Sequence, residues 1–315
     1  MKTTVILCTF NRCELLENAL DSLARSVLPA DVDWDVLVVD NNSTDRTADV
    51  IKSFCKRYPG RFRYLFEPRP GKSNALNSGI RESPCDVLAF TDDDVVVEPT
   101  WLQNVTRGVD GTCAGVGGRI LPEHTFSPPN WIPFDDRHAL APLAVFTPDI
   151  AAGPMDQPPY GANMAYDRQV FEKYGGFRTD LGPQAGSKNP QKSEDSEFGQ
   201  RLLAGGEKLR YEPSAIVYHT VPPHRVQKKY FLDWWYDKAR ADIHVRGIPT
   251  ETRWSVAGVP LILFRRLAMW TLRWALAFEP AKRFSCKLKV WIKMGEIREC
   301  YRLSRMATAD RSQPG

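Results

Sequence analysis

Short apolar runs alternate with amphipathic segments over most of the chain. Runs of β-branched and other apolar residues at 4–8, 35–40 and 86–90 have the length and composition of strands that are covered on both faces. Between them, apolar residues recur every three or four positions over 14–24 and 47–58, which predicts helices that pack on a sheet. This alternation predicts an α/β fold with a mostly parallel sheet and right-handed crossovers.

The same alternation continues after a turn that contains glycine and lysine. A strand is expected over 62–68 before this turn, and the turn opens a helix that reaches Ile80. Residues 121–160 are rich in proline and aromatic residues, so we expect an irregular segment that covers or shapes a binding site. The elements expected beyond it are a strand over 160–166, a short helix up to Gly175, a polar loop over 182–195, an amphipathic helix up to Gly205 and a strand over 209–220.

The part of the chain from residue 224 onward differs from the rest in charge. It has 19 Lys and Arg against 8 Asp and Glu, a net charge of +11, whereas residues 1–223 have 23 against 30, a net charge of −7. One helix is expected over 228–247 and two more over 254–300. We therefore predict a helical and basic C-terminal region over 226–315.

Seven cysteines are scattered along the chain without the spacing of a zinc site or a Cys-X-X-Cys pair. Neither a disulfide framework nor a structural metal site is expected, and a reducing compartment suits this pattern. The first residues pass from a short apolar run directly into polar ones, unlike a signal peptide. These observations predict a cytoplasmic protein.

The stretch LAFTDDDVVVEPTWL, residues 88–102, runs an apolar segment into three consecutive aspartates. Adjacent carboxylates repel one another, so a fold keeps them together where they are fully solvated or where a cation neutralises them. A solvated turn is the simpler interpretation of a lone Asp-X-Asp on a loop. Because Asp92, Asp93 and Asp94 lie between a buried strand and three valines, a divalent cation shared with a bound diphosphate explains them better.

Other polar residues are expected at the same edge of the sheet. Ligands of open α/β sheets bind beyond the carboxyl ends of the strands. Asp40 ends one predicted strand, the turn at 9–12 follows another, and the aspartates follow a third. These features converge on one crevice.

Two classes of enzyme place Asp-X-Asp after an apolar strand. In phosphotransferases of the haloacid dehalogenase type, the first Asp is a nucleophile and lies on the opening strand. In nucleotide-sugar glycosyltransferases of GT-A fold, the acids bind a metal ion. The acids of this chain follow its fourth predicted strand, which favours the second class.

Six segments of the chain occur in the order typical of the family 2 inverting glycosyltransferases. They are VILCTFNR, VLVVDNNSTD, PRPGKSNALNSGI, FTDDDVVVEPTWL, GANMAYDRQVFEKYGGF and SEDSEFGQRLLAGG. The chain between about residues 3 and 225 resembles this family. The resemblance implies a GT-A fold, with a Rossmann-like and mostly parallel sheet flanked by helices. It also implies a catalytic domain over 1–225, with a nucleotide-binding half at 1–120 and an acceptor half at 121–225.

The resemblance further implies roles for residues of the nucleotide-binding half. Thr9, Asn11 and Arg12 would line the nucleotide, and Asp40 would accept a hydrogen bond from the base, which is usually uracil in relatives. Lys72, which opens a helix, would approach the diphosphate, where a cation and free N–H groups suit an anion.

The three aspartates would bind the metal and the donor. Asp92 and Asp94 match the two acids of the family's Asp-X-Asp motif and would bind Mn²⁺ or Mg²⁺, with Asp92 nearer the ribose. Asp93, between them, would belong to the donor site.

Further site residues are implied in the acceptor half. Asp195 would act as the general base on the acceptor hydroxyl, and Glu194 would orient it; alternatively both are acids that the helix dipole favours in a first turn. His219 would complete the metal shell or else is a structural histidine at the end of a strand. Gly161, Ala162 and Asn163 match a segment beside the donor sugar, although glycine and alanine also suit tight packing. His224 and Arg225 are weaker candidates for contact with the diphosphate.

The expected activity is the transfer of a hexose from a nucleotide sugar, a UDP-sugar in the first instance. The acceptor would be a hydroxyl of a saccharide or of a lipid-linked glycan, in the synthesis of a cell-surface polysaccharide or glycan. Two alternatives stay open at this point. One is the phosphotransferase described above, and the other is a relative that binds nucleotide without catalysis.

The basic C-terminal region raises the question of whether the protein contacts a membrane. Its longest uncharged stretch, residues 254–264, is too short to span a membrane, which takes about 20 residues. Arginines at 265, 266 and 273 interrupt apolar residues in the pattern of a helix that lies in a membrane interface, so a peripheral location on the cytoplasmic face is one expectation. The alternative is a helix packed on the protein or on a second subunit. No module that binds nucleic acid is recognisable.

Overall fold

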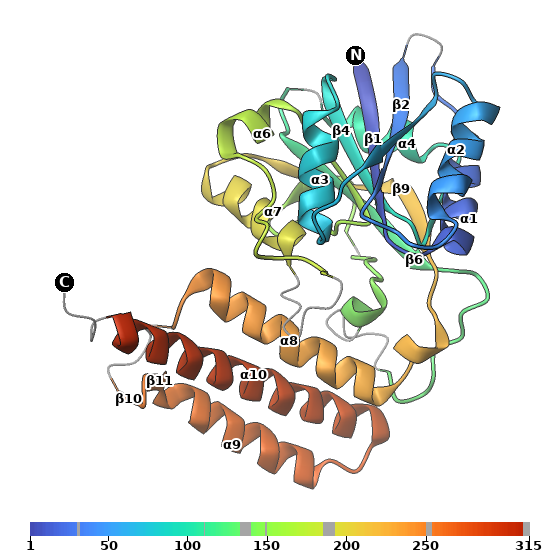
Figure 1. Cartoon of the computed structure of the whole chain (residues 1–315). Coiled ribbons are helices and arrows are strands. Elements are labelled where there is room, and N and C mark those ends of the chain that lie inside the picture. Colours follow the sequence, from blue (N-terminus) through green and yellow to red (C-terminus); the bar gives the residue numbers. More distant parts are fainter. Residues whose placement is uncertain are drawn as a thin grey trace. The chain divides into compact units, whose positions relative to one another are not determined.

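The computed structural model describes residues 1–29, 32–109, 111–132, 140–148, 150–184, 193–249 and 254–310, with side chains up to residue 306 (Figure 1). Two compact units are distinguished. The first comprises Met1–Phe126, Ala144–Ser187 and Glu194–Thr220, and the second comprises Ser127–Leu143, Lys188–Ser193 and Val221–Gly315. The domain border predicted at residue 225 stays a prediction.

A mixed sheet forms the centre of the first unit. Its strands among the described residues are β1 (Lys2–Thr9), β2 (Asp33–Asp40), β3 (Phe62–Phe66), β4 (Val87–Asp92), β5 (Val95–Val97), β6 (Gly115–Pro122), β7 (Gly153–Met155), β8 (Asn163–Asp167) and β9 (Leu209–His219). Their order is β3-β2-β1-β4-β8-β6-β9-β5, and β7 pairs with β9.

The longest strand pairings of this sheet are parallel. β1 pairs in parallel with β2 and β4, β2 with β3, and β6 with β9. β8 lies antiparallel between β4 and β6, and the short strands β5 and β7 pair antiparallel with β9. The predicted α/β fold with a mostly parallel sheet is confirmed, and the antiparallel strands are the part that the alternation of strands and helices did not show.

Helices pack on this sheet through their apolar residues. They are α1 (Cys13–Ala24), α2 (Thr47–Arg57), α3 (Lys72–Arg81), α4 (Trp101–Arg107), α6 (Gln169–Tyr174) and α7 (Glu194–Ala204). α3 approaches β1 and β2 closely at Gly79, where a Cβ atom would lie 2.9 Å from Cγ2 of Ile6. A larger residue there would push α3, and with it the N-terminus of the helix at Lys72, away from the sheet.

The proline-rich segment is partly regular. Within residues 121–160, the described part contains the end of β6, the 3-10 turn η1 (Ala141–Leu143) and β7. β7 was not expected, because Pro154 cannot donate to a strand ladder; the strand is an edge of three residues, where a missing donor is tolerated. Residues 133–139 and 149 of this segment lie outside the described residues, as do 185–192 of the predicted polar loop.

The second unit is helical, as predicted for the C-terminal region. It contains α8 (Lys228–Arg246), α9 (Leu261–Leu276), α10 (Pro280–Asp310), the turn η2 (Pro223–Arg225) and the short strands β10 (Ser255–Val256) and β11 (Val259–Pro260). α10 packs on both α8 and α9 and lies between them (Figure 1). No helix in the described ranges is both long enough and apolar enough to cross a membrane.

A buried carboxylate ties α10 to α8. Glu299 is completely buried, and its oxygens accept hydrogen bonds from Arg302 on the same helix, at 2.8 Å, and from Arg240 on α8, at 3.3 Å. A buried charge is tolerated when it is paired and hydrogen-bonded in this way. The pairing helps to set how α8 and α10 lie against each other.

Candidate active site

The register of the parallel strands brings several candidate residues to one edge of the sheet. Thr9 at the end of β1 pairs with Asp40 at the end of β2, and Cys8 pairs with Asp92 at the end of β4. Because parallel strands end at the same edge, three segments far apart in the sequence meet there. The residues expected to line one crevice therefore gather at the carboxyl ends of β1, β2 and β4.

The three aspartates occupy the tight connection between β4 and β5. Asp93 and Asp94 are almost completely buried, because β5 continues at once into the sheet by pairing with β9. Arg12, in the turn after β1, donates from one guanidinium nitrogen to Oδ1 of Asp93 at 2.8 Å and to Oδ2 of Asp94 at 3.0 Å. Free solvation, the simpler interpretation of these acids, does not apply to Asp93 and Asp94.

Burial and mutual repulsion shape the ionisation of this cluster. Burial raises the pKa of Asp93 to about 6, with Arg12 acting in the opposite direction and Asp94 adding to the rise. Burial opposes the charge of Arg12, but the Asp93 and Asp94 carboxylates raise the pKa of Arg12 above its ordinary value. The two carboxylates therefore stabilise the charged form of Arg12, and the negative charge of the cluster favours the binding of cations.

Lys72 at the N-terminus of α3 pairs with the first aspartate. Its Nζ lies 2.5 Å from Oδ1 of Asp92, and both side chains are about one-fifth exposed. Burial lowers the pKa of Lys72, but the carboxylates of Asp92 and Glu194 raise it by more. Lys72 is thus a charged group that pairs with Asp92 and is also influenced by the charge of Glu194.

The second carboxylate pair begins α7. Glu194 is buried, and Asp195 beside it is half-buried. Oδ2 of Asp195 accepts a hydrogen bond from the backbone N–H of Gly161 at 2.8 Å, and Oδ1 accepts one from the N–H of Ser196 at 2.7 Å. Two backbone donors therefore fix the orientation of the Asp195 carboxylate.

Glu194 differs from its neighbour. Burial, and then the charge of Asp195, raise the pKa of Glu194 to about 7, against the effect of Lys72. The difference between the two acids comes from their surroundings, since Asp195 is held by two backbone N–H groups and Glu194 is buried next to Gly182 and Ser73. Of the two, Asp195 is the one whose surroundings suit a carboxylate that accepts a proton.

His219 at the end of β9 lies beside the last aspartate. Its Nε2 is 3.4 Å from Oδ1 of Asp94, and the imidazole is almost completely buried. β9 pairs with β5 at this point, His219 opposite Val95, so the sheet itself holds the histidine next to the aspartate.

The site is strongly acidic. Five carboxylates, those of Asp92, Asp93, Asp94, Glu194 and Asp195, surround only two of the cationic side chains predicted for the site, Arg12 and Lys72. Fully ionised, these seven groups carry a net charge of −3. Such a net negative charge favours the binding of a further cation.

A divalent cation fits this donor set. Among the described residues, no group of three or more His, Cys, Asp or Glu side chains is arranged to hold a metal ion by itself. Mg²⁺ and Mn²⁺ take one or two carboxylates and complete their shell with phosphate oxygens and water. Asp94 and His219, which are adjacent and buried, can supply part of such a shell, whereas Asp92 is paired with Lys72 in this structure.

Not every predicted site residue faces the crevice. The side chain of Asn163 is completely buried: Oδ1 accepts from the indole N–H of Trp101 at 2.8 Å, and Nδ2 donates to the carbonyls of Arg119 and Ala215. These bonds favour a structural role that ties β8 to β6 and β9. Contact of Asn163 with the donor sugar would have to come from its backbone, and it stays a prediction.

Asn11 and Asp40 are also held by protein groups. Asn11 has a positive φ of 50°, and its Oδ1 accepts from the N–H of Thr44 at 2.7 Å, which joins the turns after β1 and β2. Each oxygen of Asp40 accepts one hydrogen bond, from the N–H of Ser43 and from the hydroxyl of Tyr64. A carboxylate oxygen can accept a second bond, so recognition of a base by Asp40 stays a prediction.

Gly161 lies directly beside the second carboxylate pair. A Cβ atom on this residue would be 3.3 Å from Oδ2 of Asp195, so glycine keeps the carboxylate accessible to its backbone N–H. His224 and Arg225 lie in η2, in the second unit, and their contact with a diphosphate stays a prediction.

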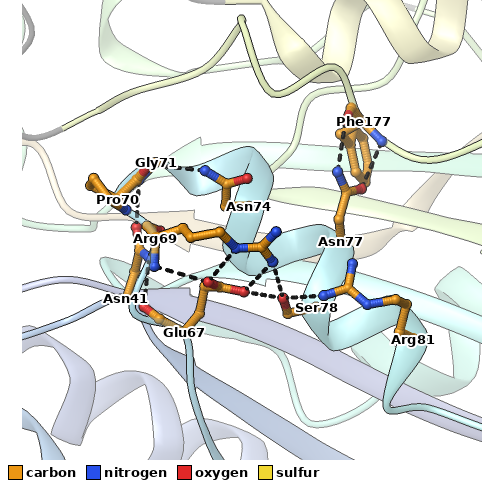
Figure 2. Close-up of polar contacts among 10 residues, drawn as sticks. All are labelled: Asn41, Glu67, Arg69, Pro70, Gly71, Asn74, Asn77, Ser78, Arg81 and Phe177. Carbon is orange, nitrogen blue, oxygen red and sulfur yellow. Dashed lines mark hydrogen bonds and ion pairs between the residues drawn. The ribbon is translucent and has the colours of Figure 1, made fainter.

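A polar network missed at the level of sequence fixes the turn that leads to Lys72 (Figure 2). Nδ2 of Asn41 donates to the carbonyls of Glu67 and Arg69, and its Oδ1 accepts from the N–H of Gly71 at 2.8 Å. Gly71 has a φ of +121°, which side chains with a Cβ atom rarely adopt. The stretch EPRPGK, residues 67–72, does indicate a turn, because a charged pair flanks a proline shortly before a glycine. Asn41, which accepts the hydrogen bond from Gly71, lies 30 residues away in the sequence, so this contact could not be predicted.

Glu67 is the centre of this network. It is buried and accepts two hydrogen bonds from the guanidinium of Arg69, each at 2.8 Å, and another from the hydroxyl of Ser78 on α3. Arg81 in turn donates to Ser78 at 2.7 Å. The hydrogen bonds from Arg69, with a further contribution from Ser78, hold the pKa of Glu67 at about 2 although burial acts in the other direction.

We predict that Glu67→Gln lowers the free energy of unfolding in a pH-dependent way. The folded-state pKa of Glu67 is about 2, below the ordinary value of 4.5, so its contribution is present above about pH 4.5 and is lost as the pH falls toward 2. With allowance for the solvent around Arg69, we expect a loss of about 1 kcal/mol at pH 7.

Urea unfolding of the parent and of Glu67→Gln between pH 7 and about pH 2.5 measures this effect, because the difference should stay constant down to about pH 4.5 and shrink below it. Glu82→Gln, which replaces an exposed carboxylate just after α3, serves as the control. A difference between parent and Glu67→Gln that does not shrink with falling pH contradicts the assignment.

The chain matches a known family over more than half of its length. Residues 4–175 match the family described as Glycosyl transferase family 2. The chain belongs to glycosyltransferase family 2. This confirms the family predicted from the six ordered segments and, with it, the predicted class of enzyme.

Two relatives of the family 2 chain show the range of its similarity. The succinoglycan biosynthesis protein ExoM of Rhizobium meliloti (strain 1021) is 28% identical over 220 residues, which cover 69% of this chain and 66% of that protein. The glucosyl-dolichyl phosphate glucuronosyltransferase of Haloferax volcanii is 26% identical over 242 residues, or 74% of this chain and 72% of that protein. Other relatives are matched over smaller parts, such as 24% of a validoxylamine A glucosyltransferase of Streptomyces hygroscopicus subsp. jinggangensis.

Solved structures share the fold of the family 2 chain. A mannosyltransferase of Pyrobaculum calidifontis, PcManGT, in complex with GDP-Man and Mn²⁺, superimposes with a TM-score of 0.57 at 20% identity and covers 99% of this chain and 76% of its own. TarS of S. aureus, residues 1–349, has a TM-score of 0.52 at 14% identity and covers 100% and 93%. The predicted GT-A fold is confirmed.

Proposed function

We propose that this family 2 protein catalyses metal-dependent, inverting transfer of a hexose from a nucleotide sugar to a hydroxyl group. The donor would be a UDP-sugar, as the resemblance to the family implies. The acceptor would be a saccharide or a lipid-linked glycan, in the synthesis of a cell-surface polysaccharide or glycan. Two relatives support this acceptor class by name, one as a protein of succinoglycan biosynthesis and the other as a transferase acting on glucosyl-dolichyl phosphate.

One observation carries the proposal. Asp92 at the end of β4 pairs with Lys72, and Glu194 at the start of α7 lies with Ser73, the next residue of α3, around Gly182, although about one hundred residues separate the two groups of acids. One pair can serve the departing diphosphate and the other can serve the incoming hydroxyl. A transfer between two substrates needs both functions in a single crevice.

The donor side of the crevice would be formed by residues at the ends of β1, β2 and β4. Thr9, Asn11 and Arg12 would line the nucleotide, with Asp40 toward the base. Lys72 would meet the diphosphate at the N-terminus of α3, where helix N–H groups add to its charge.

Asp92, Asp94 and His219 would hold a divalent cation, Mn²⁺ or Mg²⁺. Such a cation, when bound, neutralises charge that develops on the leaving diphosphate. Arg12 already spans Asp93 and Asp94 and keeps the two carboxylates in place. The solved mannosyltransferase with GDP-Man and Mn²⁺ supports a divalent cation for this chain, and it adds GDP to the nucleotides that a test has to include.

Asp195 would remove the proton from the acceptor hydroxyl. Inversion requires the hydroxyl to approach the sugar from the side opposite the leaving group, so the base has to lie away from the metal ligands. Asp195 is on α7, in a different segment from the aspartates that end β4, and its carboxylate is oriented by Gly161. Glu194, whose pKa is raised by burial and by the charge of Asp195, would lie beside this base and help to orient it.

The two alternatives predicted from the sequence are not equally supported. Membership of family 2 and the place of the aspartates on β4 argue against a phosphotransferase with an aspartyl nucleophile. A relative that binds nucleotide without turnover has the same fold and the same binding edge. As part of the proposal, the protein works in the cytoplasm, where nucleotide sugars are its donors.

The proposal is tested by nucleotide release from a panel of UDP-, GDP- and dTDP-sugars, with Mn²⁺, with Mg²⁺ and with chelator. We expect release from one donor that requires the divalent cation and increases when saccharide or lipid-linked acceptors are added. Binding of a nucleotide with no release from any donor, in the presence of acceptors, identifies the non-catalytic relative. An aspartyl phosphate detected by mass spectrometry overturns the proposal.

A further inference from the structure

α9 packs on its neighbours through one side only. Its contacts within the second unit are mainly with α10 and with the short strand β11. Trp274 of α9 meets Trp291 of α10 edge to face, with ring centres 6.2 Å apart, and Leu263 is buried in the small core between the helices. In Figure 1, α9 and α8 lie on opposite sides of α10.

The opposite side of α9 is exposed and apolar. Residues that recur every three or four positions along this side share a face of the helix. The exposed fractions are 43% for Leu261, 37% for Phe264, 61% for Leu272 and 64% for Leu276. Just beyond the helix, Phe278 is 91% exposed. Soluble monomers rarely leave several large apolar side chains uncovered on one helix face, which points to a partner for this face.

The charges on this surface have one sign. Between Leu261 and Phe278 there are three arginines, Arg265, Arg266 and Arg273, and no acidic residue. All three are exposed, and the guanidinium of Arg273 lies 4.9 Å from the ring centre of Trp270, along the side of the helix. The partner that suits an apolar stripe beside arginines has both an apolar interior and a negative surface.

A second copy of this chain suits the surface poorly. A symmetric dimer would bring the same face of both copies together. That interface would contain the arginines of both copies and no carboxylate from α9 to offset them, which is unfavourable. A membrane surface with anionic lipids avoids this conflict.

The dimensions of α9 suit a helix that lies in the plane of a membrane. Its 16 residues span about 24 Å, less than the hydrocarbon core, and arginines interrupt the apolar sequence. Helices of this kind bury the apolar face at the boundary between head groups and acyl chains, with basic side chains among the head groups.

We propose that the outer face of α9, defined by Leu261, Phe264, Leu272, Leu276 and the adjoining Phe278, docks on an anionic lipid bilayer. The arginines of α9 contact the head groups, and the apolar side chains enter the interface. This surface is independent of the proposed transferase chemistry, because none of its residues belongs to the candidate active site.

Flotation of the full chain with lipid vesicles tests this proposal. Vesicles of phosphatidylcholine alone are compared with vesicles that also contain phosphatidylglycerol, in the absence of donor, metal and acceptor. We expect binding to the anionic vesicles that weakens with added salt. Leu272→Asp combined with Leu276→Asp should lower the partition coefficient at least about thirtyfold, and Arg265→Gln combined with Arg273→Gln about tenfold or more.

Control variants test whether a loss of vesicle binding comes from this face of α9 and not from a general effect of the substitutions. Val27→Asp replaces another exposed apolar residue, 60% exposed and outside the second unit, and should leave binding unchanged. Thermal unfolding verifies that each variant is folded. Vesicle binding is measured without substrates, so its result does not depend on catalysis. If the protein binds vesicles but releases no nucleotide, the docking proposal holds and the proposed function fails.

Three outcomes contradict the proposal, and the first two are as follows. In one, the parent floats with neither kind of vesicle. In the other, sedimentation shows a dimer that the two leucine substitutions dissociate, which assigns the face to a second copy. Equal binding of the parent and the double leucine variant to anionic vesicles also contradicts a role for this face.

Discussion

Asp94→Asn is expected to lower donor turnover by about a hundredfold to a thousandfold. The substitution keeps the size of the side chain and removes a buried carboxylate that lies 3.4 Å from His219 and 3.0 Å from Arg12. If Asp94 holds the divalent cation, the variant loses several kcal/mol of stabilisation of the leaving diphosphate, which corresponds to this range of rates. The concentration of Mn²⁺ required for half-maximal rate should rise as well.

The control for Asp94→Asn is a carboxylate at the other end of the same strand. Asp86 precedes β4, is exposed, and accepts a hydrogen bond from the N–H of Lys2 at 2.7 Å. Asp86→Asn should retain the parental rate and metal dependence. Circular dichroism and thermal unfolding verify that Asp94→Asn is folded, which we expect because the change reduces repulsion among the acids. An Asp94→Asn enzyme with parental rate and Mn²⁺ dependence would falsify the metal assignment.

Asp195→Asn is expected to lower kcat by about a thousandfold while nucleotide binding is preserved. General base catalysis contributes about a hundredfold to ten-thousandfold, and an amide cannot take the proton of the acceptor hydroxyl. The amide can still accept the hydrogen bond from Gly161, so the geometry of the loop is retained. The binding of UDP or GDP with Mn²⁺, measured by calorimetry, should change by less than about threefold, since α7 lies on the acceptor side of the crevice.

The control for Asp195→Asn lies on the same helix. Glu197 pairs with Arg201 at 2.8 Å, one turn further along α7, and has no contact with Gly161 or Lys72 in the described structure. Glu197→Gln should leave kcat close to the parental value. If Asp195→Asn keeps its kcat, or if it loses nucleotide binding to the same degree as turnover, Asp195 is not the base.

These two variants distinguish the functions of the two carboxylate pairs. Asp94→Asn should change the response to the metal, and Asp195→Asn should not. Loss of metal dependence in both would mean that the acids form a single ion-binding cluster around Lys72 rather than two separate groups.

The sheet and its binding edge could be predicted from the sequence. Buried strands in a parallel sheet are continuous apolar runs, so β1, β2 and β4 were visible, and the helices between them followed from apolar residues at every third or fourth position. The polar residues at the ends of these runs then marked the carboxyl edge. The antiparallel placement of β8 was not visible, because a run of five residues has no direction of its own.

The candidate site was predictable as a set of residues but not as a set of contacts. Arg12 and the aspartates it binds are about 80 residues apart, and nothing local to either segment specifies that pairing. Asn163 resembled a site residue in the sequence, and only the buried partners Trp101, Arg119 and Ala215 indicate its structural role. The network around Glu67 was missed for the same reason.

By itself, the sequence determined the order and type of the main elements, the acidic character of the first part and the basic, amphipathic character of the second. Those properties depend on residues close together along the chain. Only the tertiary structure decided which acid meets which base, how the two carboxylate pairs share Lys72, and that the apolar side of α9 is left exposed once α10 has covered the other. Such contacts depend on how distant segments pack, and the local pattern of apolar and polar residues does not encode them.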